Sequence, residues 1–369
     1  MREPKSTLKK LSSAKSADRA DEPVESLTSG IIPRVGGIAV SPRRVARAGD
    51  AAVLAPARRS LGERFARRFR ADLPLYLMAL LPLTVVIVFQ YFPLYGLQIA
   101  FRNFTYAEGI WGSAWVGLEH FAYFFRTPYV WRITRNTLAL SFLQIAICFP
   151  APILLALLMN ELRSSTFKRT VQTISYMPHF LSTAVLIGIY MDLTRVYNGR
   201  INAFIELLGG QRIAFFSEPG WFRFLYISSD LWQGIGWGTI IYLAAISGVD
   251  QELYEAAAMD GAGRWRRMWH VTVASIAPTI VVLFILRMGG LLGNDTQKIL
   301  LMYSPATYET ADVIGTFIYR VGIAGGATPG ALPNPSLGTA VGLLQNVLGF
   351  FLVLGTNQVA RRLSEYSLW

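Results

Sequence analysis

The side chains that most often carry chemistry in proteins are few and scattered in this sequence. It has one cysteine, Cys148, and three widely separated histidines, His120, His179 and His270. A lone cysteine forms no disulfide framework and no thiolate metal site, and a zinc site needs several ligands close together. No Gly-Lys pair occurs, although a Walker A loop needs one to hold nucleotide phosphates. The sequence therefore predicts no metal site, no bound cofactor and no enzymatic activity for this chain.

One short segment, residues 250–270, has a composition suited to docking. It begins as an acidic, alanine-rich helix around Glu255 and is interrupted at Gly261 and Gly263 before a basic stretch with two tryptophans. A helix with little side-chain bulk lets its backbone approach a partner closely, and glycine permits a sharp turn. The alternative is an ordinary surface loop with an alanine-rich first turn.

A charged side chain, Arg287, interrupts an otherwise uncharged stretch that runs from 271 to 294. Charge inside a membrane is costly and often marks function, and a guanidinium can hold a carboxylate through two parallel hydrogen bonds. The alternative is that the long side chain reaches to the membrane interface.

The composition indicates a membrane protein. Hydrophobic residues make up 53% of the chain and charged residues 16%, with a mean hydropathy of +0.37. This is too apolar for an ordinary soluble domain. A pI near 9.9 is also typical of nucleic-acid binding, but the basic residues lie at the edges of apolar runs, where they act as a topology signal. We expect no nucleic-acid partner.

Uncharged runs long enough to cross a membrane predict the fold class. A spanning helix needs roughly 20 mostly apolar residues. Six runs are candidates, and they cover residues 73–101, 136–160, 170–191, 231–249, 271–294 and 337–360. The sequence therefore predicts an all-α integral membrane protein with six transmembrane helices.

The distribution of lysine and arginine predicts the orientation. If the N-terminus is inside, the inner segments hold 24 of the 35 basic residues. Cytoplasmic segments carry an excess of basic residues. We therefore expect both termini, and segment 250–270, to be cytoplasmic.

The N-terminal region differs from the rest. Residues 1–58 show no sustained apolar period, and they predict a disordered, basic cytoplasmic tail. Within residues 59–72, Leu61, Phe65 and Phe69 recur every four positions among arginines, which predicts a basic amphipathic helix on the inner membrane surface. The alternative for this stretch is a frayed extension of the first span.

The string EAAAMDGAGRWRRMWHVTVASIAP resembles the EAA loop of type I, binding-protein-dependent ABC importer permeases. The positions that match the family pattern are Glu255, Ala256, Ala257, Asp260, Gly261, Ala262 and Pro278. Met268 and Ala274 depart from it, where the family has an aromatic residue and a proline. Stretches such as PLYGLQIAFRNF, QTISYMPHF and IIYLAAISGVDQELYEAA are similar to the branch that imports oligosaccharides. The resemblance covers residues 72–369.

The resemblance implies the type I permease fold in a bacterial plasma membrane. It implies a second permease subunit that forms a heterodimer with this one, two cytoplasmic ABC ATPases that bind ATP and magnesium, and an extracytoplasmic solute-binding protein. The residues that it assigns to ATPase coupling are Tyr254, Glu255, Ala256, Ala257, Asp260, Gly261 and Ala262.

An oligosaccharide substrate gives the polar residues of the spans a role. Arg287 favours an acidic, uronate-containing sugar, and Tyr242, Asn294 and Gln345 are further candidates for the substrate path. Polar groups in spans more often hydrogen-bond between helices. The same machinery for a peptide or polyol is an alternative. An ion-coupled secondary transporter is less favoured, because no Asp or Glu lies inside the six runs.

Overall fold

The computed structural model describes residue 69, residues 72–325 and residues 332–363. Helices are the main regular elements of this part, and one isolated bridge pairs Arg102 with Trp115. The predicted tail, 1–58, and nearly all of the predicted amphipathic helix, 59–72, lie outside the described residues.

The first apolar segment is continuous from Leu73 to Phe101. It consists of α2 (Leu73–Val86), η1 (Ile87–Tyr91) and η2 (Phe92–Phe101). These are the residues of the first predicted span. No side chain of α2 is buried within the chain, whereas η2 packs against α17 (Pro335–Leu363). The apolar surface of α2 therefore faces lipid or another protein.

The second segment is a continuous helix of 31 residues. It comprises α5 (Val130–Leu143), η3 (Gln144–Cys148) and α6 (Pro150–Asn160). The helix begins six residues before the predicted span at 136, because Arg132 and Arg135 lie in its first two turns instead of ending it.

The third segment departs from the prediction of one continuous span over 170–191. The structure has α7 (Ser165–Tyr176) with η4 (Met177–Phe180), and then α8 (Thr183–Thr194), bent by 103°. Pro178 lies in η4, and the side chain of Ser182 accepts a hydrogen bond from the Val185 N–H, 3.3 Å, to start the new helix. The search for uncharged runs could not detect this bend, because the residues that form it are themselves uncharged.

The fourth segment, α10 (Pro219–Ser247), begins twelve residues before the predicted span at 231. It packs mainly against α6. Asp230 marked the edge of the uncharged run, yet it lies inside this helix. The uncharged run 231–249 contains no acidic residue, but the longer helix that includes it does, and neighbouring helices supply partners for this carboxylate.

The fifth segment is one helix from Arg264 to Gly289. It comprises α12 (Arg264–Arg267), η5 (Met268–Val273) and α13 (Ala274–Gly289). The predicted span, 271–294, extends beyond it, because the helix ends at Gly289 and Gly290. The last segment, α17, packs against α13 and α16 (Ile314–Gly322).

Four of the described helices are long and apolar enough to cross a membrane, and the bent pair of α7 and α8 makes a fifth if it counts as one span. α10 has 29 residues, which is long enough, but polar residues such as Asp230 and Gln233 lower its hydropathy. The six predicted spans fall on these five segments and α10.

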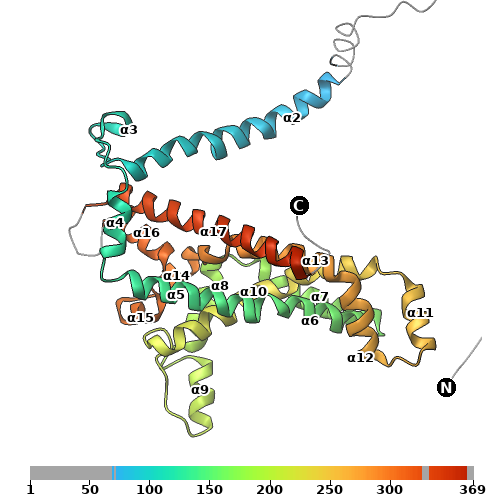
Figure 1. Cartoon of the computed structure of the whole chain (residues 1–369). Helices are drawn as coiled ribbons and strands as arrows, with labels where there is room; N and C mark the ends of the chain where they lie inside the picture. Colours follow the sequence, from blue (N-terminus) through green and yellow to red (C-terminus); the bar gives the residue numbers. More distant parts are fainter. Residues whose placement is uncertain (1–68, 70–71, 326–331, 364–369) are drawn as a thin grey trace, which may run out of the picture. The chain divides into compact units, whose positions relative to one another are not determined.

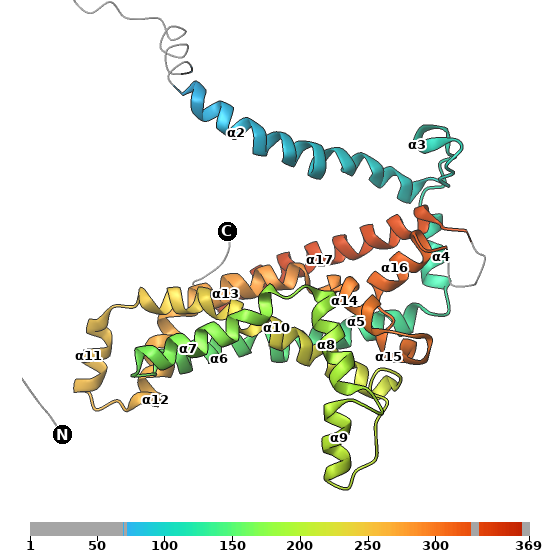
Figure 2. The same cartoon turned by 180° about the vertical axis from the view of Figure 1, so that it is seen from behind.

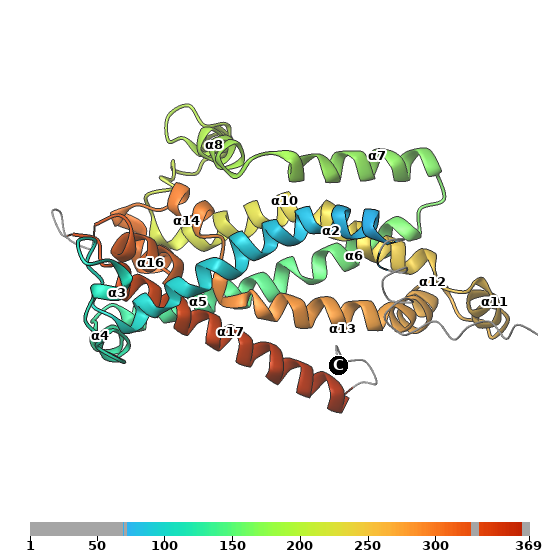
Figure 3. The same cartoon turned by 90° about the horizontal axis from the view of Figure 1, so that it is seen from above.

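Shorter helices fill the connections. They are α3 (Gly109–Gly112), α4 (Glu119–Arg126), α9 (Arg200–Leu207), α11 (Gln251–Met259), η6 (Leu291–Gly293), α14 (Thr296–Met302), η7 (Pro305–Thr307) and α15 (Tyr308–Ala311). Within residues 74–369, α11 and α12 lie at one end of the long helices, and α3, α4, α15 and α16 lie at the other end (Figures 1, 2 and 3).

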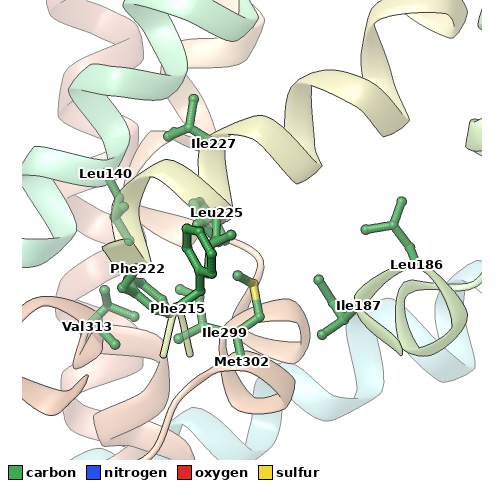
Figure 4. Close-up of a cluster of buried hydrophobic side chains, with 12 residues drawn as sticks. Leu140, Leu186, Ile187, Phe215, Phe222, Leu225, Ile227, Ile299, Met302 and Val313 are labelled. Atoms are coloured by element: carbon green, nitrogen blue, oxygen red, sulfur yellow. The ribbon is translucent and has the colours of Figure 1, made fainter. Parts of the chain in front are cut away.

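The main apolar cluster lies on the side of α10 that faces α5, α8 and α14 (Figure 4). Its members include Leu140, Ile187, Phe222, Leu225, Ile299 and Met302. Burial of each such side chain stabilises a fold by roughly 1.5–3 kcal/mol, although lipid reduces this gain inside a membrane. The cluster fixes α14 beside α10.

A buried carboxylate, Asp312, joins the helices at the end opposite α11. Arg320 donates two hydrogen bonds to it and Arg132 of α5 donates one, each at 3.0 Å. Burial by itself lowers the pKa of the Arg320 guanidinium, but the hydrogen bonds and charge of Asp312 raise it above its ordinary value. Removing one partner would leave a buried charge uncompensated, so this cluster holds α5 and α16 together.

Gly236 provides a test of the packing between α10 and α7. A Cβ at this position would collide with the carbonyl of Ser175, whereas a Cβ at Gly220, on the same helix, meets nothing within 4 Å. We expect Gly236→Ala to destabilise the protein by about 1–3 kcal/mol and Gly220→Ala to leave stability unchanged or slightly raised. Thermal unfolding in detergent measures both, and equal unfolding midpoints would contradict the close contact.

Candidate functional site

The segment predicted to couple the chain to an ATPase forms the separate short helix α11. Its N-cap is Asp250, whose carboxylate accepts a hydrogen bond from the Glu252 N–H at 3.0 Å. No residue of α11 is buried. Glu255 and Ala256 are exposed on its surface. The helix therefore presents an acidic, small-residue face without a partner from the described residues.

The turn after α11 requires glycine. Gly261 has φ of +76°, and it follows Asp260, which ends the helix. The Gly261 N–H donates to the carbonyl of Ala258 at 3.0 Å, and the Ala262 N–H donates to the carbonyl of Ala257 at 2.9 Å. This pair of bonds is the Schellman motif, which ends a helix with a left-handed residue. Three of the matched motif residues therefore form one local hydrogen-bonded turn.

Two side-chain contacts connect this turn to the long helices. The hydroxyls of Tyr254 and Thr272 share a hydrogen bond of 3.0 Å, which joins α11 to η5. Arg264 donates to the carboxylate and to the carbonyl of Glu161, both at 3.1 Å, which joins the start of the fifth helix to the end of α6. These contacts join α11 to the fifth helix, and the start of the fifth helix to the end of α6.

A cavity of about 280 Å³ lies between α6, α10 and α13. Its lining includes Cys148, Pro152, Asp230, Gly234, Tyr242, Leu283 and Arg287. Two of the four predicted substrate-path residues, Tyr242 and Arg287, therefore share one cavity. Arg287 keeps 47% of its side chain exposed.

The other two predicted substrate-path residues lie elsewhere. Asn294 is buried and donates to the carbonyl of Thr137 at 3.4 Å. Gln345 donates to the carbonyl of Leu292 at 3.0 Å, and it lines a different, largely apolar cavity. Both side chains donate hydrogen bonds to backbone carbonyls close to where α13 ends. Polar residues in spans more often have this role of bonding between helices.

Sequence reasoning missed Asp230 and Lys298. The Lys298 ammonium lies 3.2 Å from one carboxylate oxygen of Asp230, and Arg287 lies 3.9 Å from the other. Gln144 of η3 also donates to Asp230 at 3.2 Å. Asp230 directly precedes an apolar run in the sequence, and this position could have indicated that it belongs to the helix. The predicted span was instead taken to begin after it.

An aromatic pair joins η4 to α10. The rings of His179 and Trp237 stack with centroids 4.4 Å apart and planes 4° from parallel. Seven residues separate Trp237 from Asp230 on α10, and at 3.6 residues per turn they lie on nearly the same face. Trp237 remains 47% exposed.

Comparison with known proteins identifies the family. Residues 149–364, more than half of the chain, match the family of the "binding-protein-dependent transport system inner membrane component". The chain belongs to this family. The match contains the whole of α10, α11 and α13. This protein is therefore the permease, the multi-pass and non-catalytic inner membrane component of a binding-protein-dependent ABC transporter, and the predicted fold class and lack of enzymatic role are confirmed.

Individual relatives agree with this result. The permease is 42% identical over 295 residues to the polygalacturonan/rhamnogalacturonan transport system permease protein YteP of Bacillus subtilis, covering 80% of this chain and 90% of YteP. It is 37% identical, with a TM-score of 0.74, to a chain in the crystal structure of a bacterial alginate ABC transporter in complex with an alginate pentasaccharide-bound periplasmic protein. The match covers 83% of the permease and 100% of that chain.

A second solved structure is of a bacterial ABC transporter involved in the import of the acidic polysaccharide alginate. Its matched chain is 38% identical with a TM-score of 0.73, and the match covers 81% of the permease and 99% of that chain. At this identity and coverage, the arrangement of the helices is shared.

The turn at Gly261 provides a test of coupling. Gly261→Val forces a branched side chain into a left-handed conformation, at a cost of roughly 1–2 kcal/mol. Gly263 has φ of −66°, and both glycines have open space where a Cβ would lie. We expect Gly261→Val to insert in the membrane but to lose ATPase attachment and uptake, while Gly263→Val retains both. Co-purification of the ATPase and uptake of substrate measure this, and wild-type behaviour of Gly261→Val would refute the role of the turn.

Proposed function

We propose that the permease moves an acidic oligosaccharide from an extracytoplasmic binding protein into the cytoplasm. The observation that carries this proposal is Arg287, a guanidinium at the wall of a cavity between membrane helices. A charged side chain inside a membrane is energetically costly, and one that is kept there often has a function. A guanidinium matches the geometry of a carboxylate through paired hydrogen bonds, and a uronate residue supplies a carboxylate.

The names of the relatives support the same class of substrate. One permease is named for polygalacturonan and rhamnogalacturonan, and two solved transporters are for alginate, described as an acidic polysaccharide. Tyr242 adds an aromatic side chain to the cavity that Arg287 lines, and a site of this kind combines apolar walls with a few polar groups.

The orientation follows from the distribution of charge and from the position of α11. α11 and α12 lie at one end of the long helices (Figure 3), and α12 itself contains Arg264, Arg266 and Arg267. Basic segments face the cytoplasm. We therefore place α11 and both termini on the cytoplasmic side, and α3, α4, α15 and α16 on the outer side.

The energy for transport comes from a separate chain in this proposal. The family implies ATP on a partner ATPase, and the permease sequence contains no Gly-Lys pair for a Walker A loop. Two ATPase subunits, with ATP and magnesium, bind against α11 and a corresponding helix of a second permease subunit. The exposed apolar surface of α2 is available for that subunit and for lipid.

Purification of the tagged permease from its native membrane tests this assembly. We expect an ABC ATPase, a second multi-span permease and a solute-binding protein to co-purify. We also expect the isolated permease to hydrolyse no ATP, because it has no phosphate-binding loop. Hydrolysis by the permease alone, or purification as a lone subunit under conditions that keep membrane complexes intact, would contradict the proposal.

Substitution of Arg287 tests the substrate class. Arg287→Met keeps the length of the side chain and removes its charge. We expect uptake of an oligouronate to fall about tenfold or more, as the loss of a hydrogen bond to a charged group does, while expression stays normal. Arg195→Met, at an exposed ion pair with Asp192, is the matched control and should transport normally. Unchanged oligouronate uptake in Arg287→Met would refute contact with the substrate.

A further inference from the structure

Three charged side chains meet beside the cavity, two of them at its wall, and their charges do not cancel. Asp230 lies between Lys298 of α14, at 3.2 Å, and Arg287 of α13, at 3.9 Å. The cluster contains two cations and one anion. Which of the two cations Asp230 neutralises decides the net charge that the cavity wall presents to a substrate.

The burial of Lys298 determines this division. Its side chain is 1% exposed, and its ammonium donates a hydrogen bond to Asp230 at 3.2 Å. The ring of Tyr226 lies 6.0 Å away and adds only a weak attraction. A buried ammonium without a counter-ion is strongly destabilising. Lys298 therefore needs the negative charge of Asp230 as its counter-ion.

Arg287 interacts with Asp230 more weakly than Lys298 does. Its separation of 3.9 Å is within ion-pair distance but too long for a hydrogen bond. Its side chain is half exposed, and among the described residues none accepts a hydrogen bond from its guanidinium within bonding distance. Gln144 occupies the Asp230 oxygen nearest to Arg287, with a hydrogen bond of 3.2 Å.

We propose that Lys298, although it does not line the cavity, sets the cavity's preference for acidic substrates. By neutralising Asp230, it leaves Arg287 as the net positive charge at the wall, available to bind a carboxylate. Without Lys298, Asp230 would pair with Arg287 and the wall would be neutral. Lys298 is thus a positioning residue for specificity, and its role rests on the proposed contact between Arg287 and the substrate.

The test compares acidic and neutral ligands on the assembled transporter in lipid nanodiscs. The solute-binding protein is omitted, because it has its own selectivity. The probes are trigalacturonate and the same trisaccharide with its carboxyl groups reduced to alcohols, and calorimetry measures both dissociation constants. We expect Lys298→Met to reduce the preference for the acidic ligand by about tenfold or more, with little change for the neutral ligand.

The double variant Lys298→Met with Asp230→Asn separates charge balance from structure. It removes one cation and one anion, so Arg287 again carries the net positive charge. We expect the acidic preference to return to within about threefold of the wild-type value. If the single variant does not assemble, the double variant alone decides, because the proposal requires that it keep the acidic preference.

Several outcomes would overturn the proposal. An unchanged preference in Lys298→Met, an equal loss of both ligands, or a double variant without the acidic preference would each show that Lys298 is only structural. Arg287→Met distinguishes the two levels of the argument. If Arg287→Met loses the preference and Lys298→Met does not, the role of Lys298 fails and the proposed function stands. If Arg287→Met keeps the preference, the proposed contact itself fails.

Discussion

The ion pair between Lys298 and Asp230 is the contact on which the cavity depends. Lys298 is almost fully buried, so its charge must be neutralised where it lies. The apolar cluster around Ile299 and Met302 holds α14 beside α10 (Figure 4). The ion pair joins the same two helices at one further point. In our proposal, the same pair also sets the charge left at the cavity wall, so that one interaction serves both stability and specificity.

The two candidate sites lie on the same helices. The helix from Arg264 to Gly289 begins beside the turn after α11 and ends at the cavity with Arg287. Thr272, which bonds to Tyr254 of α11, precedes Arg287 by fifteen residues, or roughly 22 Å of helix. The segment is one continuous helix, although it contains the π-helical turn η5 and Pro278. If an ATPase binds α11 as we propose, this helix offers a route by which its displacement could reach the wall of the cavity.

A second helix makes the same connection. Glu161, which binds Arg264, follows the end of α6, and Pro152 of α6 lines the cavity. The carbonyl of Pro152 accepts a hydrogen bond from Thr239 of α10 at 3.2 Å. Two of the three helices around the cavity are thus joined to the turn after α11, while α10 is held by its contacts with both.

The sequence by itself determined the features that rest on local rules. Apolar runs had to become helices, because lipid cannot satisfy backbone polar groups, and the turn at Gly261 is formed by residues at most five apart. Arg287 was evident as a charge within an apolar run. Only the tertiary structure decided the bend before α8, the separation of Asn294 and Gln345 from the cavity, and the partner of Asp230. These features depend on contacts distant in sequence, and Asp230 and Lys298 are 68 residues apart. A residue's own neighbours along the chain do not encode which charge from another helix will neutralise it.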